Sequence, residues 1–507
     1  MGAASSQPVP RAFEDEKQAV ARRMGSLSLQ DKKGAYVDEE DDQPPPYSAR
    51  ERATTISLSQ AKHWEEQLLL DPRNRLAISA LSANPLSAIL TCHDATIADT
   101  QIFNIKIPFE GAPITNQRSS GRCWLFASTN VFRVAIMKKY NLKEFELSQN
   151  YLFYWDKIEK ANWFLEQAID TADEDLDSRL VQALFASPVN DGGQFDMVAN
   201  LVKKYGLVPQ PLYPDSYNSK SSSTMSRLLT TKLREHALIL RDLARSKSSK
   251  AQALLADRKE QFLQEIHRIL TIMLGTPPSP EKKFTWDFYD ANDKYHRISL
   301  TPTEFASSLS SKEGVRACGG TDVNKLFSLV NDPRNPYGRL LTVERLGNVV
   351  GGRPVSYVNV DMDTMKSAAI AMLRAGIPVF FGSDVGKFSD SKLGIMDTDL
   401  YDYNLGFNIT LGLNKAQRLQ TGESAMTHAM VLTAVHIEGG KPVRWRVQNS
   451  WGEAAGDKGY FVMTDKWMDE FVYQVVVDPR FVSKEISDIL NQEPLKLPLW
   501  DPMGALA

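Results

Sequence analysis

The chain has 507 residues, of which 42% are hydrophobic and 24% are charged, and its formal net charge at pH 7 is −3. This length exceeds one ordinary hydrophobic core and predicts two or three structural units. The small net charge excludes an overall attraction to nucleic acid or anionic membrane, and no apolar run is long enough to span a bilayer. Three widely spaced cysteines, Cys92, Cys123 and Cys318, exclude a disulfide framework and favour a reducing, cytoplasmic compartment.

The first 56 residues predict a disordered N-terminal extension. They combine an acidic run at 38–42 with little apolar periodicity. Gly2 begins a segment that fits the N-myristoylation pattern, although an ordinary small-residue start explains the same residues. The segment Pro44–Tyr47 would suit a WW-domain protein through a polyproline II conformation, and a passive linker is the alternative. Acidic residues at 14–16 argue against a mitochondrial presequence, while a mitochondrial pool beside a cytoplasmic one stays open.

Periodicity then predicts helices in the N-terminal half and strands in the C-terminal third. Helical spacing begins near Ser57, a short strand is expected at 103–107, and residues 145–212 are mainly helical. Two amphipathic helices are expected within 226–274, separated by a serine-rich turn. The strands expected in the C-terminal third are 355–360, 378–382, 429–437, 443–448 and 459–464.

One cysteine has a sequence context that predicts chemistry. Cys123 comes just ahead of an apolar periodic stretch, where a helix N-terminus would lower the pKa of its thiol and favour the nucleophilic thiolate. Gln117, six residues upstream, offers an amide that would donate to an oxyanion. Far downstream, His428 and Asn449 complete a Cys-His-Asn arrangement. The alternative is a small buried cysteine with no reactivity. The set as a whole predicts a cysteine hydrolase.

The spacing of the histidines supports this pairing. The turn signal at 438–442 folds two apolar runs back on each other, which places His428 opposite or diagonal to Asn449. His436 lies eight residues further along the same strand, roughly 26 Å away at about 3.3 Å per residue, and is expected to be structural. The remaining histidines have no partner motif: His63, His93, His236, His267 and His296.

These residues suggest one mechanism. His428 would hold Cys123 as a thiolate–imidazolium pair, and Asn449 would orient the imidazole. The Gln117 amide and the backbone N–H of Cys123 would stabilise the oxyanion, and Trp451 would cover the hydrogen bond between the histidine and the asparagine. No metal or cofactor is expected.

The motifs resemble those of the papain-like cysteine peptidases, and most closely the bleomycin hydrolase family. The papain-like resemblance rests on the cysteine segment and on residues 191–193, 427–429, 449–452 and 459–460. The closer resemblance covers roughly residues 57–507 and includes 119–126, 143–149, 331–334, 426–430 and 500–507. Ser120 stands where many secreted papain-like enzymes carry a disulfide cysteine, which again favours a reducing compartment.

The resemblance implies an α+β, papain-like fold. It has a helical lobe, an antiparallel β-barrel-like lobe and a large, partly helical insertion. Cys123 and His428 are 305 residues apart (428 − 123), against a papain-type interval of roughly 130–150, so the surplus is assigned to the insertion. The expected parts are a disordered extension (1–56), an N-terminal segment and helical lobe (57–214), the insertion (215–345), the β-rich lobe (346–490) and a C-terminal tail (491–507).

The resemblance also implies a cytosolic cysteine aminopeptidase that assembles as a homohexamer. Its catalytic residues would be Cys123, His428 and Asn449, with the oxyanion donor and supporting residues Gln117, Gly192, Gly193, Trp451 and Ala507. The tail would occupy the cleft, and its terminal carboxylate would meet the free amine of the substrate. Family members often carry one further C-terminal residue, whereas this sequence stops at Ala507. The implied substrates are peptides and small amides, including bleomycin-like compounds and homocysteine thiolactone.

Two other classes of function stay open. A Cys-His-Asn site can transfer an acyl group to an amine instead of to water. A nucleic-acid-binding or scaffold protein with incidental hydrolysis is the second, because residues 226–260 contain nine Lys or Arg against four acidic residues. A solvated helix face is the favoured explanation of that imbalance.

Overall fold

The computed structural model describes residues 55–246, 248–307 and 323–506. The expectations for Gly2, Pro44–Tyr47 and Ala507, and nearly all of the extension 1–56, concern residues outside these ranges. The chain divides into two compact units, residues 1–70 and 71–507. In the first unit the described part is mainly the helix α2 (Leu58–Leu70). The division into five parts stays a prediction.

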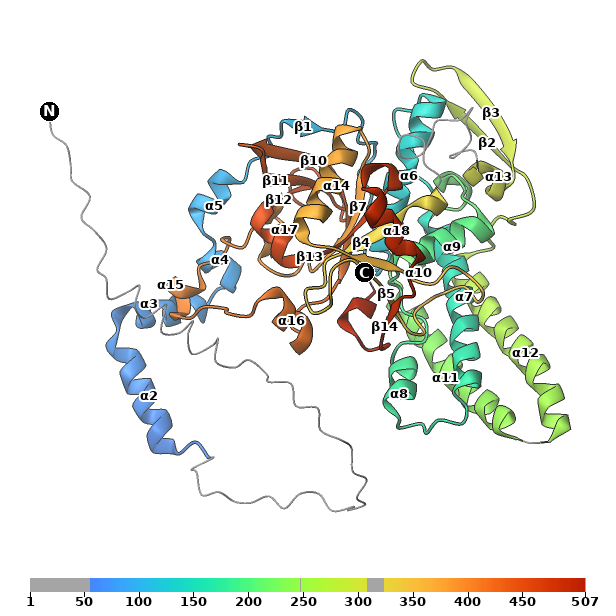
Figure 1. Cartoon of the computed structure of the whole chain (residues 1–507), viewed down its shortest axis with the longest axis horizontal. Coiled ribbons are helices and arrows are strands. Elements are labelled where there is room, and N and C mark those ends of the chain that lie inside the picture. The colour runs from blue at the N-terminus through green and yellow to red at the C-terminus, as the bar shows by residue number, and fades with distance from the viewer. Residues whose placement is uncertain (1–54, 247, 308–322, 507) are drawn as a thin grey trace. The chain divides into compact units, whose positions relative to one another are not determined.

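The second unit is built around one large mixed sheet (Figure 1). In spatial order its strands are β14 (Leu495–Leu497), β5 (Arg339–Val343), β6 (Tyr357–Asn359), β4 (Phe327–Val330), β13 (Val472–Val477), β7 (Val379–Ser383), β10 (His428–Glu438), β11 (Lys441–Gln448), β12 (Tyr460–Thr464), β9 (Ile395–Met396) and β8 (Ser389–Asp390), and β1 (Ile105–Lys106) also pairs with β10. Three pairs are parallel, β4 with β6, β5 with β14 and β9 with β12. Within the expected β-rich lobe (346–490), β7 pairs with β10 and β13, and β11 pairs with β10 and β12, all antiparallel, whereas the short β9 pairs with β12 in parallel. The strand β6 lies between β4 and β5, which run in opposite directions, so one of its pairings must be parallel.

The predicted strands of the C-terminal third are confirmed as β6, β7, β10, β11 and β12. The turn between β10 and β11 contains Gly439 and Gly440 with φ of 56° and 82°, and Glu438 pairs with Lys441 across it. A two-residue turn with positive φ at both positions matches the twist of a hairpin. This turn fixes the register of the two strands that carry the histidine and the asparagine.

Long buried helices pack beside the sheet. The helix α6 (Cys123–Tyr140) is buried almost throughout, its polar residues Asn130 and Arg133 included, and packs against β10. The helix α7 (Gln149–Asp170) is capped by Ser148, whose side chain accepts a hydrogen bond from Tyr151 N. The helix α9 (Phe195–Tyr205) packs against both α6 and α7.

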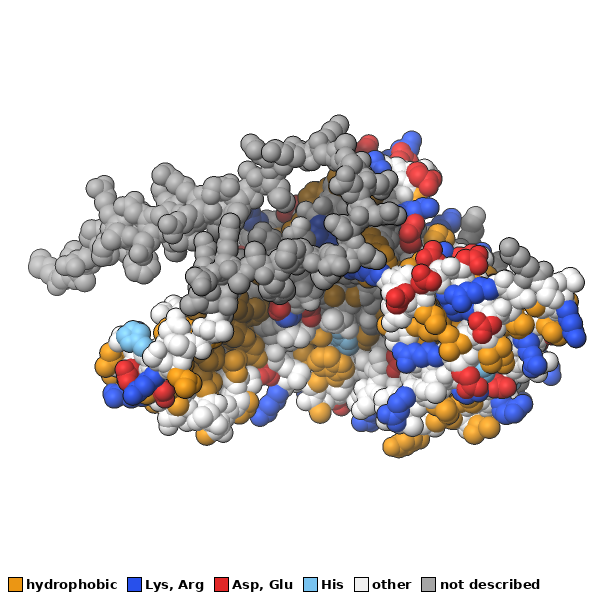
Figure 2. All heavy atoms as spheres, turned by 90° about the horizontal axis from the view of Figure 1, so that it is seen from below, with side chains coloured by type: hydrophobic (Ala, Val, Ile, Leu, Met, Phe, Trp, Pro, Cys, Tyr) orange, Lys and Arg blue, Asp and Glu red, His pale blue; other side chains and the backbone are white. Residues whose placement is uncertain are grey.

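The expected helical pair consists of α11 (Ser223–Arg245) and α12 (Ser249–Leu274), which pack on each other and on α7. Beyond it lies a hairpin of β2 (Phe284–Tyr289) and β3 (Tyr295–Leu300). On the face seen in Figure 2, basic and acidic side chains are interspersed over the region of these two helices. Lys232 pairs with Glu235, and Lys259 pairs with Glu166 of α7. This distribution fits a solvated helix face.

The remaining helices of the second unit are short. They are α3 (Pro72–Leu81), α4 (Leu86–Leu90), α5 (His93–Ala98), α8 (Arg179–Ala186), α10 (Tyr217–Lys220), α13 (Pro302–Ser307), α14 (Met362–Arg374), α15 (Tyr403–Phe407), α16 (Lys415–Thr421), α17 (Asp465–Phe471) and α18 (Lys484–Asp488), with 3-10 turns η1 (Gln210–Leu212), η3 (Val323–Lys325), η4 (Pro479–Phe481), η5 (Ile489–Asn491) and η6 (Pro502–Gly504). Across the ranges that the structure describes, no helix is both long and apolar enough to cross a membrane.

Candidate active site

Cys123 is the first residue of α6, and its side chain is only 2% exposed. The backbone N–H groups of Cys123 and Trp124 point at the sulfur from the helix N-terminus, and the N–H of Ala429 reaches it from β10. The helix and the strand therefore meet at this sulfur. Because Ala429 follows His428, the contact also places the sulfur beside the segment that carries the predicted base.

Burial governs the charge of both groups. Burial raises the pKa of the Cys123 thiol to about 11, although the three N–H groups act to lower it. Burial likewise lowers the pKa of the His428 imidazole to about 4, against the hydrogen bond that the ring donates to Asn449 Oδ1, which acts to raise it. The expected lowering of the thiol pKa is therefore wrong, because desolvation outweighs the helix N-terminus. Each charge alone is disfavoured, so an ion pair between the two would depend on their mutual attraction.

His428 and Asn449 are joined as the hairpin register predicts. His428 Nε2 lies 2.9 Å from Asn449 Oδ1, and both residues are buried. In the antiparallel register, Val431 lies opposite Gln448. Because Asn449 is one residue further along the chain and His428 is three residues back along β10, the two side chains lie diagonal to each other. The Trp451 ring lies 4.8 Å from the imidazole, centroid to centroid, which covers this hydrogen bond on one side. His436 instead lies 2.7 Å from Glu438, away from this pair.

A second connection joins the segment before the cysteine to the segment after the asparagine. Gln117 N donates to Ser450 O at 2.8 Å, and Gly452 N donates to Thr115 O at 3.0 Å. The Ser450 hydroxyl donates to Gln117 Oε1 at 2.7 Å, and Gln117 Nε2 donates to Ser120 O at 2.7 Å. The amide group is thus oriented through its oxygen, with its nitrogen turned toward the loop that leads to Cys123.

Of the predicted residues, Gly193 lies against Trp124, the residue that follows the nucleophile, and Gly192 lies beside Gly121 in the loop before it. A Cβ atom at Gly193 would come within 2.6 Å of the Trp124 ring, so only glycine fits there. Trp124 Nε1 donates to Asp191 O at 2.7 Å, and Lys160 Nζ donates to Gly192 O at 2.5 Å. These contacts lock the tryptophan, and with it the start of α6.

Sequence reasoning missed the charged network that supports this loop. The Asp191 carboxylate accepts from Gly121 N at 3.2 Å and from Lys157 Nζ at 2.6 Å. Arg122, fully buried, makes two hydrogen bonds to Asp215 at 2.7 and 3.1 Å. Asp191 stood in a recognised motif, but nothing in the sequence tied it to Lys157. Both residues that precede Cys123 are therefore held by buried or half-buried carboxylates.

The C-terminal tail lies near this loop. Gln194 Nε2 donates to Ala505 O at 2.7 Å, and Gln194 directly follows Gly193. A cavity of about 420 Å³ beside the tail is lined by Gly504, Ala505 and Leu506 together with Lys160 and other residues. Within the described residues, the tail therefore comes close to the two glycines, while Ala507 lies outside them.

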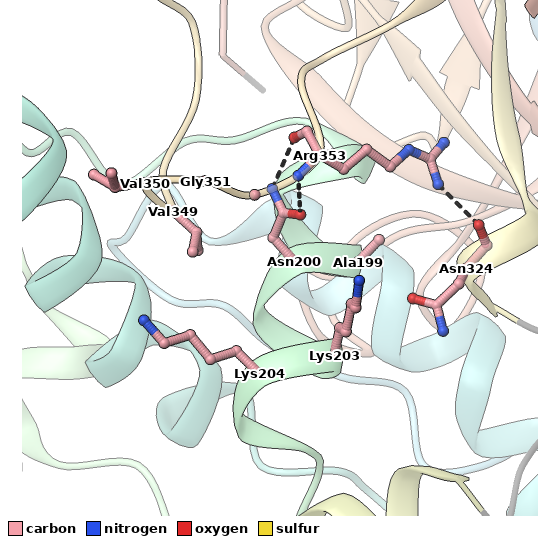
Figure 3. A pocket seen from close by; sticks show the side chains of 10 residues that line it. Ala199, Asn200, Lys203, Lys204, Asn324, Val349, Val350, Gly351 and Arg353 are labelled. Carbon is pink, nitrogen blue, oxygen red and sulfur yellow. Dashed lines mark hydrogen bonds between the residues drawn. The ribbon is translucent and has the colours of Figure 1, made fainter.

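Another cavity, of about 620 Å³, lies at the C-terminal end of α9 (Figure 3). Asn200 bonds both the N–H and the carbonyl of Arg353 there. Arg353 also pairs with the buried Asp196 at 2.6 Å. None of the predicted site residues lines this cavity. No cluster of three metal-ligating side chains occurs in the part of the chain that the structure describes.

Comparison with known proteins identifies similar chains. The model of the Peptidase C1-like family matches residues 55–504. The chain is 43% identical over 472 residues to "Cysteine proteinase 1, mitochondrial" of Saccharomyces cerevisiae, which covers 91% of this chain and 95% of that protein. It is 44% identical over 451 residues to the bleomycin hydrolase of Rattus norvegicus, and the match covers 87% of this chain and 97% of that protein. The crystal structure of PepW from Lactobacillus rhamnosis has a TM-score of 0.84 at 44% identity and covers 90% of this chain and 100% of that one.

Proposed function

The chain belongs to the Peptidase C1-like family and is a cysteine peptidase, and from this premise we propose that it is an aminopeptidase of the bleomycin hydrolase type. One observation carries the proposal: the tail reaches Gln194, next to the glycines that pack on the Cys123 loop. A tail held at Gln194 leaves little room for substrate residues that precede the scissile bond.

In the proposed reaction, His428 accepts the proton of Cys123 as the sulfur attacks the scissile carbonyl. The transfer leaves the net charge of the buried pair unchanged, which suits a site where burial disfavours each isolated charge. Asn449 orients the imidazole, and His428 then protonates the leaving amine. Water hydrolyses the thioester and regenerates the thiol.

Replacing Gln117 by alanine is expected to lower kcat by about 10²–10³-fold with a smaller change in KM, because an oxyanion donor acts mainly in the transition state. Steady-state kinetics on a peptide with a free N-terminus measures both. Gln117→Glu keeps the oxygen that Ser450 binds but removes the N–H donor, so it should behave like the alanine variant. A glutamate variant with native kcat would contradict the role.

The acid limb of kcat/KM is expected well below pH 6.5, because burial lowers the pKa of His428 to about 4. As the pH falls through that pKa, the protonated imidazole can no longer accept the Cys123 proton, and activity is lost. Asn449 acts to raise this pKa, so in Asn449→Ala the limb should move to lower pH. The measurement is kcat/KM against pH for both proteins. A limb at pH 6.5 or above, or an upward shift in the variant, would count against the assignment.

Deleting residues 504–507 is expected to let the enzyme cleave peptides whose N-terminus is blocked, because the deletion removes the tail that Gln194 holds. Mass spectrometry of products from one peptide with a free or an acetylated N-terminus measures the change. The intact protein should cleave only the free form. Unchanged product patterns after deletion would contradict the proposed role of the tail in restricting access.

The proposed homohexamer is supported by exposed apolar side chains. Residues 405–413 expose Leu405, Phe407, Ile409, Leu411 and Leu413. Contiguous exposed apolar groups of this kind mark interaction surfaces.

Peptides are the proposed substrates, with bleomycin-like amides and homocysteine thiolactone as further members of the class. A cytoplasmic location is proposed from the reduced cysteines, although the yeast relative is named mitochondrial.

A further inference from the structure

Beyond β14, which pairs with β5, and Trp500, which packs under Arg179, residues 501–505 make three polar contacts with residues outside the C-terminal segment. Asp501 pairs with Arg334, the carbonyl of Met503 accepts from the buried Tyr357 hydroxyl at 3.1 Å, and that of Ala505 accepts from Gln194. The last two contacts are single neutral hydrogen bonds to the backbone. The first is charged, and it stands where the turn η6 begins.

Arg334 bridges two carboxylates. Its Nη2 lies 2.9 Å from Asp332 Oδ2 and 2.7 Å from Asp501 Oδ1, and its Nε donates to Asp332 Oδ1 at 2.9 Å. Asp332 is fully buried, and the Arg334 and Asp501 side chains are each 12% exposed. Asp332 is itself fixed by Asn335 Nδ2 at 2.8 Å and by Asn359, whose amide holds the carbonyl of Asp332. The position of the Arg334 guanidinium is therefore fixed by contacts that do not involve the tail.

Asp501 connects the fixed guanidinium of Arg334 to the turn η6. The same oxygen that accepts from Arg334 also accepts from Met503 N at 2.8 Å, which caps η6. The turn directs residues 505 and 506 toward Gln194. The cavity of about 420 Å³ beside them leaves room into which a released tail can move.

We propose that the Arg334–Asp501 ion pair is a clamp that determines specificity, because it holds the tail in the position that limits the enzyme to free N-termini. The inference rests on the proposed aminopeptidase function. It assigns the selection of substrate to a residue pair that has no place in the chemistry at Cys123. Loosening the pair releases the tail and admits longer substrates while the nucleophile stays intact.

The test uses Asp501→Ala in the full chain with the paired free and acetylated peptides. Because a hydrogen bond to a charged group is lost together with the cap, the ratio of cleavage of the acetylated to the free peptide should rise by about tenfold or more. Asp501→Asn keeps the capping oxygen but removes the charge, so its ratio should be intermediate. Titration with a thiol-alkylating reagent, which reports functional Cys123, should give the native value in both variants.

Glu493→Ala is the matched control. It removes an exposed carboxylate from the same C-terminal segment, and this residue makes no ion pair among the described residues. Its ratio should stay native. A native ratio in Asp501→Ala, or an equal loss of both cleavages, would overturn the clamp, provided that the 504–507 deletion raises the ratio. If the deletion also leaves the ratio unchanged, the tail does not restrict access and the clamp fails with it. If the intact protein cleaves the acetylated and the free peptide equally well, the proposed aminopeptidase function fails. If Asp501→Ala does not fold, Arg334→Lys is measured in its place, with the same two outcomes.

Discussion

Replacing Cys123 by alanine is expected to lower kcat by about six orders of magnitude, as the loss of a nucleophile does in other covalent hydrolases. The α6 N-terminus and the Ala429 N–H both reach the Cys123 sulfur, whereas the other cysteine among the described residues, Cys92, lies at the start of α5. The substitution removes one buried atom and adds no polar group, so the fold should survive. Turnover of a free peptide and the thermal unfolding midpoint measure the two effects.

Cys92 offers a matched control. It is half-buried at the N-terminus of α5, and its side chain makes no capping hydrogen bond. Cys92→Ala should therefore keep native kcat and KM. Substantial turnover in Cys123→Ala, or loss of turnover in Cys92→Ala, would show that the nucleophile has been assigned to the wrong residue.

Replacing Asp191 by alanine is expected to lower the free energy of unfolding by about 3–5 kcal/mol, because it leaves the fully buried ammonium of Lys157 without its anion. Although burial alone would raise the pKa of Asp191, Lys157, Ser222 and Gly121 hold it well below its usual range. The carboxylate therefore stabilises the fold at neutral pH, and this contribution is lost only as the pH falls below about 4. Denaturant unfolding at pH 7 measures the change.

The matched control for that variant is Asp287→Ala, which breaks the exposed pair with Arg297 on the β2–β3 hairpin. A solvent-exposed pair contributes little to stability, so this variant should unfold almost as the native protein does. An Asp191→Ala protein of native stability would mean that the carbonyls of Val189 and Asn190, which also accept from Lys157, suffice for its charge.

The sequence was most informative where periodicity and short turns decide the structure. The Gly439–Gly440 turn between two apolar runs set the register, and the register predicted the contact between His428 and Asn449. The helix after Cys123 and the helical pair within 226–274 followed from their apolar spacing. These features depend on interactions between residues that are close in the chain.

The parts that could not be predicted depend on distant residues. The strand β4 is a short run of four buried residues, and periodicity cannot distinguish such a run from a helix segment. This strand lies within the region assigned to the insertion, yet it pairs with β13, about 145 residues later in the chain. The pairs Lys157–Asp191 and Arg334–Asp501 likewise join separate elements, and no spacing rule connects their members. The thiol pKa was missed for the same reason, since burial is set by the whole fold.

The backbone hydrogen bonds between Thr115–Gln117 and Ser450–Gly452 have a consequence for motion. They bind the segment that leads into the nucleophile directly to the segment that orients the base. Any movement that drew α6 away from the β10–β11 hairpin would first have to break them. These hydrogen bonds therefore oppose a hinge motion that would separate the segment before Cys123 from the segment that carries Asn449.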